Sequence, residues 1–332
     1  MTRNQSSKNE KIYSHGAGSL VNKGQKIKIM TYNVQFFAGR HYVFFFDLPD
    51  FSGPDFNVRS EDIQQTMQAV ANKITTQAPD VILLQEVDDG SKRTGKKDQL
   101  KELLSLLNGR YLYYTSAFYW KAFFVPHPKI MGGIGLKLSI LSKYQIIEAI
   151  RYDLPRLPAN FLMRPFLANR VILAATLKCM DGGKFVVLNT HLDAFVLGSD
   201  IMEQQVNKVD QILSSLDKEG TPWVIGGDFN LLPVGQYENL PDDQKGYYNQ
   251  TPEIKKLYDR YNIVPSSEQL ISSPSSWYTF WGNDPHLKSP DRTLDYLIYS
   301  KKLALKDSYV LQDGTSELSD HFPIIAEFLL PS

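Results

Sequence analysis

The sequence has one cysteine, Cys179, and no excess of charge of either sign. One cysteine cannot form an internal disulfide, which fits a reducing compartment. Lys and Arg together number 36, and so do Asp and Glu, so the formal net charge is zero. Proteins that hold nucleic acid through many phosphate contacts usually carry a basic surplus. Nucleic acid is therefore an alternative partner and not the favoured one.

Long apolar runs are also missing, since no stretch approaches the roughly 18 residues that a membrane-spanning helix needs. Residues 1–9 are polar and lack the apolar segment of a secretory signal peptide. We therefore expect a cytoplasmic or peripheral membrane protein, and a monomer. Residues 1–25 are rich in Asn, Ser, Lys and Gly, which predicts a flexible tail before one domain over residues 26–332.

What the sequence does contain is a long series of short apolar runs rich in Val, Ile and Leu, typical of buried strands. Helical apolar stripes over residues 63–74 and 206–216 lie between them. Together they predict one layered α/β domain. The expected strands cover residues 27–36, 81–87, 111–117, 136–143, 170–179, 184–192, 223–230, 293–300, 306–312 and 322–330.

Several of these strands carry or end in residues that buried strands rarely contain. An unpaired buried charge costs several kcal/mol, so each such residue needs a partner, and a metal ion is an efficient one. Gly226 and Gly227, just before one of them, suggest close approach of a ligand. The residues are Asn33, Glu86, His191, Asp228, Asn230, Asp295, Asp320 and His321.

The residue types narrow the chemistry. Carboxylates and amides without a cysteine or a tight histidine cluster favour Mg²⁺ or Mn²⁺ over zinc. His191 and His321 lie among the carboxylates and can exchange protons near neutral pH. A metal, a carboxylate base and an imidazole together suit the attack of water on phosphorus.

These residues, in this order, resemble the endonuclease/exonuclease/phosphatase superfamily over about residues 26–330. That superfamily includes deoxyribonucleases, abasic-site endonucleases, inositol-phosphate phosphatases and neutral sphingomyelinases. The resemblance implies a four-layered α/β sandwich, with two mixed sheets face to face and helices outside. It also implies Mg²⁺-dependent hydrolysis of a phosphodiester by activated water.

The resemblance also implies a role for each residue. Glu86 would be the principal metal ligand, with Asn33 supporting it and Asp320 beside the metal, directly or through water. Asp228 would orient and deprotonate the attacking water.

The remaining roles concern the substrate. Asn230 would contact the phosphate oxygens, and His191 would stabilise the charge that develops on them. His321 would polarise the phosphate or assist proton transfer, with Asp295 raising its pKa. Some nucleolytic members carry an acidic residue where this chain has Gln35, which weakens the case for a second strong metal site.

Two aromatic-dense segments, residues 41–46 and 118–125, bear on the substrate, and both are expected to be loops. They form either a small core beneath long loops or a rim that contacts lipid, where Lys121 and Lys129 would suit the bilayer interface. Such rims are implied by the likeness to neutral sphingomyelinases. We therefore favour a phospholipid or sphingomyelin headgroup as substrate. A DNA or RNA nuclease, an inositol-phosphate phosphatase and a non-catalytic module of the same fold are the alternatives.

Overall fold

The computed structural model describes residues 7–48, 50–157, 167–194 and 198–332. Two seven-stranded sheets form its centre. One has the order β1-β7-β8-β9-β10-β12-β11 and the other β13-β14-β3-β4-β6-β5-β2. Both are mixed, because the pairs β3–β4 and β9–β10 are parallel while their other pairs are antiparallel.

The strands are β1 (Ser7–Asn9), β2 (Ile12–Ser14), β3 (Lys26–Asn33), β4 (Val81–Asp88), β5 (Tyr113–Val125), β6 (Gly132–Ser142), β7 (Ile146–Asp153), β8 (Val171–Lys178), β9 (Lys184–His191), β10 (Trp223–Asp228), β11 (Asn262–Val264), β12 (Asp295–Tyr299), β13 (Ala304–Val310) and β14 (Ile324–Leu329). The helices are α1 (Ser60–Gln77), α2 (Gln99–Leu106), α3 (Ile201–Lys218), α4 (Asp242–Lys245), α5 (Lys255–Tyr258) and α6 (Ser267–Ser272).

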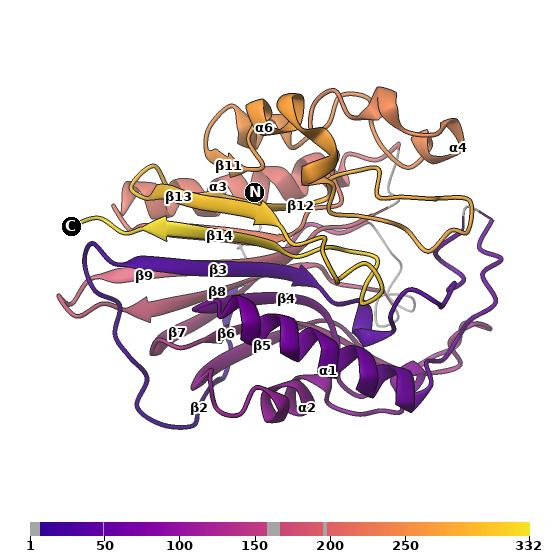
Figure 1. The fold of residues 1–332 in the computed structure, drawn as a ribbon, viewed down its shortest axis with the longest axis horizontal. Helices are drawn as coiled ribbons and strands as arrows, with labels where there is room; N and C mark the ends of the chain where they lie inside the picture. Colours follow the sequence, from indigo (N-terminus) through magenta and orange to yellow (C-terminus); the bar gives the residue numbers. More distant parts are fainter. Residues whose placement is uncertain (1–6, 49, 158–166, 195–197) are drawn as a thin grey trace, which may run out of the picture.

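Three large apolar clusters pack the two sheets and the helices into four layers. Figure 1 shows the course of these strands and helices. The central cluster joins the two sheets, with Leu83 from one and Leu297 from the other. A second packs α1 and α2 on the sheet that contains β3 and β4. The third packs α3 on the sheet that contains β9 and β10. The expected α/β sandwich of two mixed sheets with helices outside is confirmed. No helix in the described ranges has the length and apolarity to cross a bilayer.

All ten expected strands overlap an observed one, but parts of the chain differ from what was expected. Within residues 1–25, expected as a flexible tail, β1 pairs with β7, β2 pairs with β5, and Val21 is fully buried. Exposed sheet edges attract such additions, because they carry unpaired backbone groups. The aromatic segment 118–125, expected as a loop, is part of strand β5.

Gly226 and Gly227 allow strand β10 to pack closely against the strands around it. A Cβ on Gly227, whose φ is +150°, would lie 2.0 Å from the backbone oxygen of Thr190 on β9. One on Gly226 would lie 2.6 Å from Leu297 and 2.8 Å from Leu83 of the facing sheet. The interpretation that these glycines make room for a ligand is therefore wrong. They let β10 approach its neighbours closely.

We predict that Gly227→Ala destabilises the protein by about 3 kcal/mol or more, because it combines overpacking with an unfavourable φ. Urea unfolding followed by circular dichroism measures the change. Gly246→Ala is the matched control, since its Cβ would meet no atom within 4 Å. Equal stabilities of the two variants would contradict the packing role of Gly227.

Candidate active site

The eight residues singled out from the sequence meet at one cavity of about 350 Å³. Six of them line it, and Asn33 and Asp295 contact lining residues from behind. The residues on the wall are Glu86, His191, Asp228, Asn230, Asp320 and His321.

Sheet register brings three of these residues together. Asp228, at the end of β10, is the register partner of His191 on the parallel strand β9. It is also the partner of Asp295 on the antiparallel strand β12. Strands that are neighbours in a sheet lie about 4.8 Å apart, so hydrogen bonding of the strands alone places these three side chains side by side. Residues distant in sequence thus share one edge of the sheet.

The carboxylate of Asp228 is at the centre of the site. Its Oδ1 accepts a hydrogen bond from the backbone N–H of Asn230 at 2.9 Å, and its Oδ2 accepts one from Nδ2 of Asn33 at 3.1 Å. The Nε2 atoms of His191 and His321 lie 3.4 Å and 3.5 Å from Oδ2. Burial, opposed by the positive charge of His321, raises the pKa of Asp228 to about 7. A carboxylate with this pKa can accept a proton near neutral pH.

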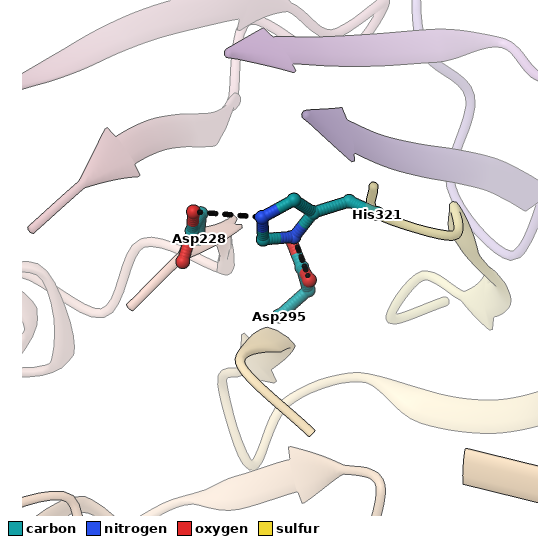
Figure 2. Close-up of side chains that lie close together, drawn as sticks. All are labelled: Asp228, Asp295 and His321. Carbon is teal, nitrogen blue, oxygen red and sulfur yellow. Dashed lines mark hydrogen bonds and ion pairs between the residues drawn. The ribbon is translucent and has the colours of Figure 1, made fainter. Parts of the chain in front are cut away.

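A second carboxylate fixes the state of His321 (Figure 2). Nδ1 of His321 lies 2.7 Å from Oδ2 of Asp295, which leaves Nε2 facing Asp228. Burial alone would favour the neutral ring, but the charges of Asp295 and Asp228 outweigh it and raise the pKa of His321 well above its ordinary value. His321 is therefore a buried imidazolium at neutral pH.

His191 is in the opposite state. Burial, followed by the positive charges of Arg170 and His321, holds the pKa of His191 well below its ordinary value. The two imidazoles beside Oδ2 of Asp228 therefore differ in charge, one neutral and one positive. Environments that push the pKa values of neighbouring groups apart are typical of sites with separate acid and base roles.

Glu86 reaches the cavity because β4 is irregular where it occurs. The register between β4 and β6 shifts between Leu84 and Val87, and Glu86 has a φ of +58°. A bulge of this kind redirects a side chain, and a positive φ at a non-glycine residue costs about 1–3 kcal/mol. Nδ2 of Asn33 lies 3.4 Å from Oε1 of Glu86. The strained backbone thus holds this carboxylate next to the Asn33–Asp228 contact.

The surroundings of Glu86 fit a divalent cation. Burial raises the pKa of Glu86, and the negative charge of Asp320 raises it further. The two carboxylates repel each other unless a cation or protons neutralise them. Among the described residues, Nδ1 of His191 and both amide atoms of Gln35 are buried without a hydrogen-bond partner. Oxygen ligands beside polar groups that lack partners suit a hydrated hard cation such as Mg²⁺.

A second group of side chains in the cavity lies close enough together to hold a metal ion. Ligand atoms of Asp228, Asp295 and His321 all lie within 4.8 Å of one another, so this buried group could hold one. However, Nδ1 of His321 and Oδ2 of Asp295 already share a short hydrogen bond. A cation there would compete with the positive imidazolium that the two aspartates stabilise. Electrostatics therefore favour the side of the cavity where Glu86 and Asp320 lie.

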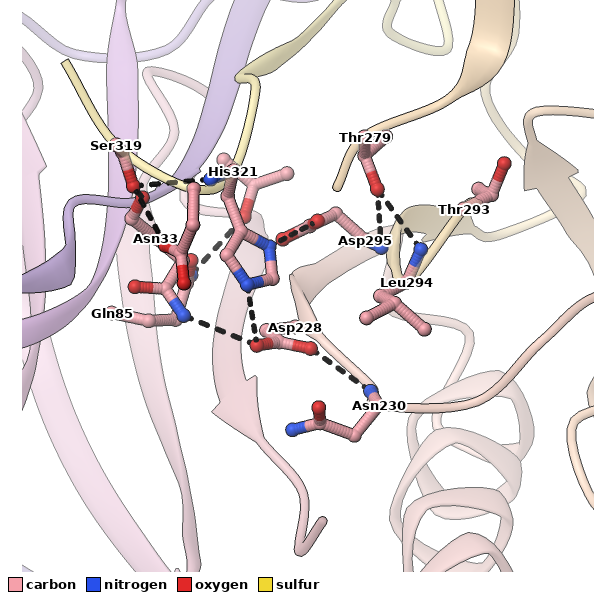
Figure 3. Close-up of polar contacts among 12 residues, drawn as sticks. Asn33, Gln85, Asp228, Asn230, Thr279, Thr293, Leu294, Asp295, Ser319 and His321 are labelled. Carbon is pink, nitrogen blue, oxygen red and sulfur yellow. Dashed lines mark hydrogen bonds and ion pairs between the residues drawn. The ribbon is translucent and has the colours of Figure 1, made fainter. Parts of the chain in front are cut away.

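Neutral polar residues support the charged ones from behind (Figure 3). Oγ1 of Thr279 accepts the backbone N–H of Asp295 at 3.0 Å, and Oγ of Ser319 donates to the backbone oxygen of Asn33 at 2.8 Å. Below the site, Nε2 of Gln85 donates to Oδ1 of Asn189 at 2.7 Å, which links the two sheets. These contacts hold strand ends from both sheets in one arrangement.

Three arginines on the cavity wall were not predicted from the sequence. Each forms an ion pair with an aspartate, which neutralises its charge in part and fixes its position. The pairs are Arg93–Asp88, Arg170–Asp193 and Arg292–Asp291. Arg170 and Asp193 flank strands β8 and β9, so their positions carry a signal that could have been noticed.

Asp47 was missed as well, and it also lines the cavity. Burial, and then the charge of Asp320, raise its pKa to about 8. It follows an aromatic segment and belongs to no strand end, so the sequence offers little to mark it.

Fold and site together define a phosphoesterase with a buried acidic and histidine centre. A family model described as the Endonuclease/Exonuclease/phosphatase family matches residues 30–321. The chain therefore belongs to this family. No curated protein matches it at a significant level.

Solved structures with the same fold include a protein named for its family, one crystallised with sulfate and one named as a sugar phosphatase. A Beutenbergia cavernae endonuclease/exonuclease/phosphatase is 22% identical, with a TM-score of 0.62, covering 92% of this chain and 72% of that one. The human Nocturnin catalytic domain with bound sulfate is 21% identical, with a TM-score of 0.56 and 96% of both chains covered. A Bacteroides thetaiotaomicron mannosyl-6-phosphatase is 16% identical, with a TM-score of 0.53, covering 92% of this chain and all of that one (100%). At these identities the likeness shows the fold alone.

We predict that Asp228→Asn lowers the rate of phosphate-ester hydrolysis by roughly 10²–10⁴-fold, the usual contribution of a general base. The replacement has the same shape, so the urea midpoint should not fall. Asp243→Asn, at an exposed carboxylate, is the control and should keep full activity. Activity of Asp228→Asn close to that of the unchanged protein would remove Asp228 from the chemistry.

The state of His321 gives a prediction on pH. Its folded-state pKa exceeds the ordinary 6.5 of an unfolded chain, so its pairing stabilises the fold fully below about pH 6.5. This stabilisation disappears as the pH rises through the folded pKa. Nitrogen NMR of the metal-free protein should show His321 still protonated above pH 7. In Asp295→Asn the ring should lose its proton at lower pH. A His321 that titrates near 6.5 in the unchanged protein would contradict this assignment.

Proposed function

We propose that the protein hydrolyses a phosphodiester of a phospholipid or sphingolipid, with Mg²⁺ as the cofactor, at a membrane surface. The observation that carries the proposal is an exposed aromatic surface on the strand that forms part of the cavity wall. Tyr119 and Trp120 of β5 line the cavity, and Phe123 and Phe124 follow on the same strand. At about 3.3 Å per residue, they lie roughly 10–15 Å farther along it.

The surface at the β5–β6 turn, here called the hairpin tip, comprises Phe123, Phe124 and Met131. Phe123 is 99% exposed, and the other two are about half exposed. Exposed Phe51 lies beside it, because Nζ of Lys129 donates to the backbone oxygen of Phe51 at 3.1 Å. Contiguous exposed apolar side chains mark interaction surfaces, and aromatic rings with lysine suit the lipid interface.

The other aromatic segment, residues 41–46, supports this surface less directly. Tyr42 and Phe44 are buried in the core beneath α1, as in the alternative of a small core beneath a loop. Phe45 and Phe46 instead line the cavity. The proposed membrane contact therefore rests on the hairpin tip and not on residues 41–46.

The charged residues have separate roles in this proposal. Glu86, with Asn33 and Asp320, would hold Mg²⁺ (or Mn²⁺), which supplies charge neutralisation at the phosphate and lowers the pKa of water. Asp228 accepts the proton of the attacking water.

The residues that face the substrate complete the proposed mechanism. Asn230 and the neutral His191 contact phosphate oxygens, and the imidazolium of His321 stabilises the developing negative charge or protonates the leaving oxygen.

A nuclease is the second candidate, because a basic groove of about 410 Å³ also borders Tyr119. Lys8, Lys121, Arg151 and Arg156 lie along it, and such charges can follow a nucleic-acid backbone. Arg151, however, is already bound to Asp153 at 2.8 Å. The groove also contains Glu10, so fewer charges are free than the lining suggests.

The other two alternatives have less support. No observation favours an inositol-phosphate phosphatase over a lipid hydrolase. A non-catalytic module would have no need for buried carboxylates and imidazoles with opposed pKa shifts.

The substrate is tested by assaying sphingomyelin, phosphatidylcholine, plasmid DNA and an inositol polyphosphate side by side with Mg²⁺. We expect turnover of a lipid, loss of activity with a chelator, and recovery with Mg²⁺ or Mn²⁺. Asp228→Asn serves as the background for contaminating enzymes. Preferential cleavage of DNA would overturn the lipid proposal and support the nuclease.

The hairpin tip is tested with the double variant Phe123→Ser and Phe124→Ser. Because each exposed ring contributes about 1.5–3 kcal/mol when buried in lipid, we expect vesicle binding to weaken by at least tenfold. Hydrolysis of a soluble short-chain substrate should not change. Ile271→Ser, at an exposed apolar residue elsewhere, is the control. Unchanged sedimentation of the double variant with vesicles would exclude the tip as the membrane contact.

A further inference from the structure

A second, smaller pocket of about 60 Å³ opens beside the catalytic cavity. The two share part of their walls, namely Phe45, Phe46, Arg93 and Trp120. The two pockets are therefore adjacent, with these four side chains between or around them. The side pocket lies between the segment that follows β3 and the hairpin of β5 and β6, on the side of the hairpin tip.

The walls of the side pocket are mainly apolar. They are formed by Phe45, Phe46, Phe56, Trp120, Ile130 and Ile134. An apolar pocket that continues a polar one is the arrangement expected for a ligand with a polar group at one end and hydrocarbon at the other.

The charged groups of the side pocket are bound to the protein itself. Nζ of Lys92 donates to the backbone oxygen of Met131 at 3.1 Å, and Nζ of Lys129 donates to that of Phe51. Asp55 accepts the backbone N–H of Val43 at 2.7 Å.

Arg93 also interacts with the protein itself. It donates two hydrogen bonds to Asp88, and its guanidinium lies 3.4 Å from the centre of the Phe36 ring. These charges are therefore not arranged to bind a second phosphate.

The volume limits what can enter. A water molecule needs about 10–15 Å³ of cavity volume, and a methylene group is of similar size. The 60 Å³ of the side pocket therefore holds about four to six methylene groups. The pocket is thus too small for a whole acyl chain or a nucleobase with its sugar. It fits a short piece of hydrocarbon.

We propose that the side pocket binds the carbons nearest the phosphate ester in an alkyl or acyl chain of the substrate. The pocket would thereby select an amphiphilic ester over a purely polar one. This inference rests on the proposed function, because it assumes that a phosphate group occupies the catalytic cavity. It differs from membrane contact at the hairpin tip, since it concerns a single substrate molecule in solution.

The test uses n-alkyl phosphonates with one to ten carbons, which the enzyme cannot hydrolyse at the phosphorus–carbon bond. Their dissociation constants are measured by calorimetry on the full chain with Mg²⁺, below the concentrations at which they form micelles. We expect Kd to fall by about fourfold for each added CH₂. The gain should stop after about four to six carbons, when the pocket is full.

Two variants change the pocket in opposite directions. Ile130→Phe should fill it and flatten the dependence on chain length, while methylphosphonate binds as before. Phe56→Ala should enlarge it and move the plateau to longer chains. Ile271→Phe is the matched control for the first, because Ile271 is 82% exposed and lies outside the pocket.

The outcomes separate this inference from the proposed function. If affinity does not depend on chain length, or if no alkyl phosphonate binds, the proposal that the side pocket binds hydrocarbon is wrong, even if lipids are hydrolysed. A chain-length effect that Ile130→Phe leaves intact also overturns it. If no lipid is hydrolysed but the plateau and both variant effects appear, the side pocket stands and the substrate is another amphiphilic phosphate ester.

Discussion

The crowding of several fully or partly buried carboxylates in one cavity is the constraint on which the site depends. Asp228, Glu86 and Asp320 meet there, and each has a raised pKa of which burial is the main cause. On one side the imidazolium of His321, itself held by Asp295, neutralises part of this charge. On the side of Glu86 and Asp320, no buried arginine or lysine forms an ion pair with either carboxylate among the described residues. The charges of Arg93, Arg170 and Arg40 lower the pKa values of these two carboxylates only in part. A divalent cation would neutralise the rest.

Sheet register explains how distant segments build such a site. The parallel pairs β3–β4 and β9–β10 end at the same edge of their sheets, so Asn33 and Glu86 approach Asp228 from the facing sheet. The glycines before Asp228 let the strands pack closely enough for these contacts. Strand ends from both sheets thus position the charged groups of the cavity.

Much of this could be predicted from the sequence, and the reasons are physical. Buried strands appear as apolar runs, and acidic residues or histidines at their ends are conspicuous because burying them is costly. The short edge strand β1 and its neighbour β7 were missed, since partly exposed strands mix polar and apolar residues. The glycine pair was misinterpreted because sequence cannot show whether a ligand or a neighbouring strand comes close. Arg170 precedes strand β8 and could have been noticed, whereas Asp47 lies in a segment outside the strands and leaves no local pattern.

Anomalous diffraction from crystals grown with Mn²⁺ would locate a cation bound at Glu86 beside the Asp228–His321 pair. We expect one strong peak within coordination distance of a Glu86 carboxylate oxygen, with Asp320 or its bound water nearby. The hydrogen bond between His321 and Asp295 should persist. A peak between Asp228, Asp295 and His321, or no peak in the cavity, would refute a cation site at Glu86.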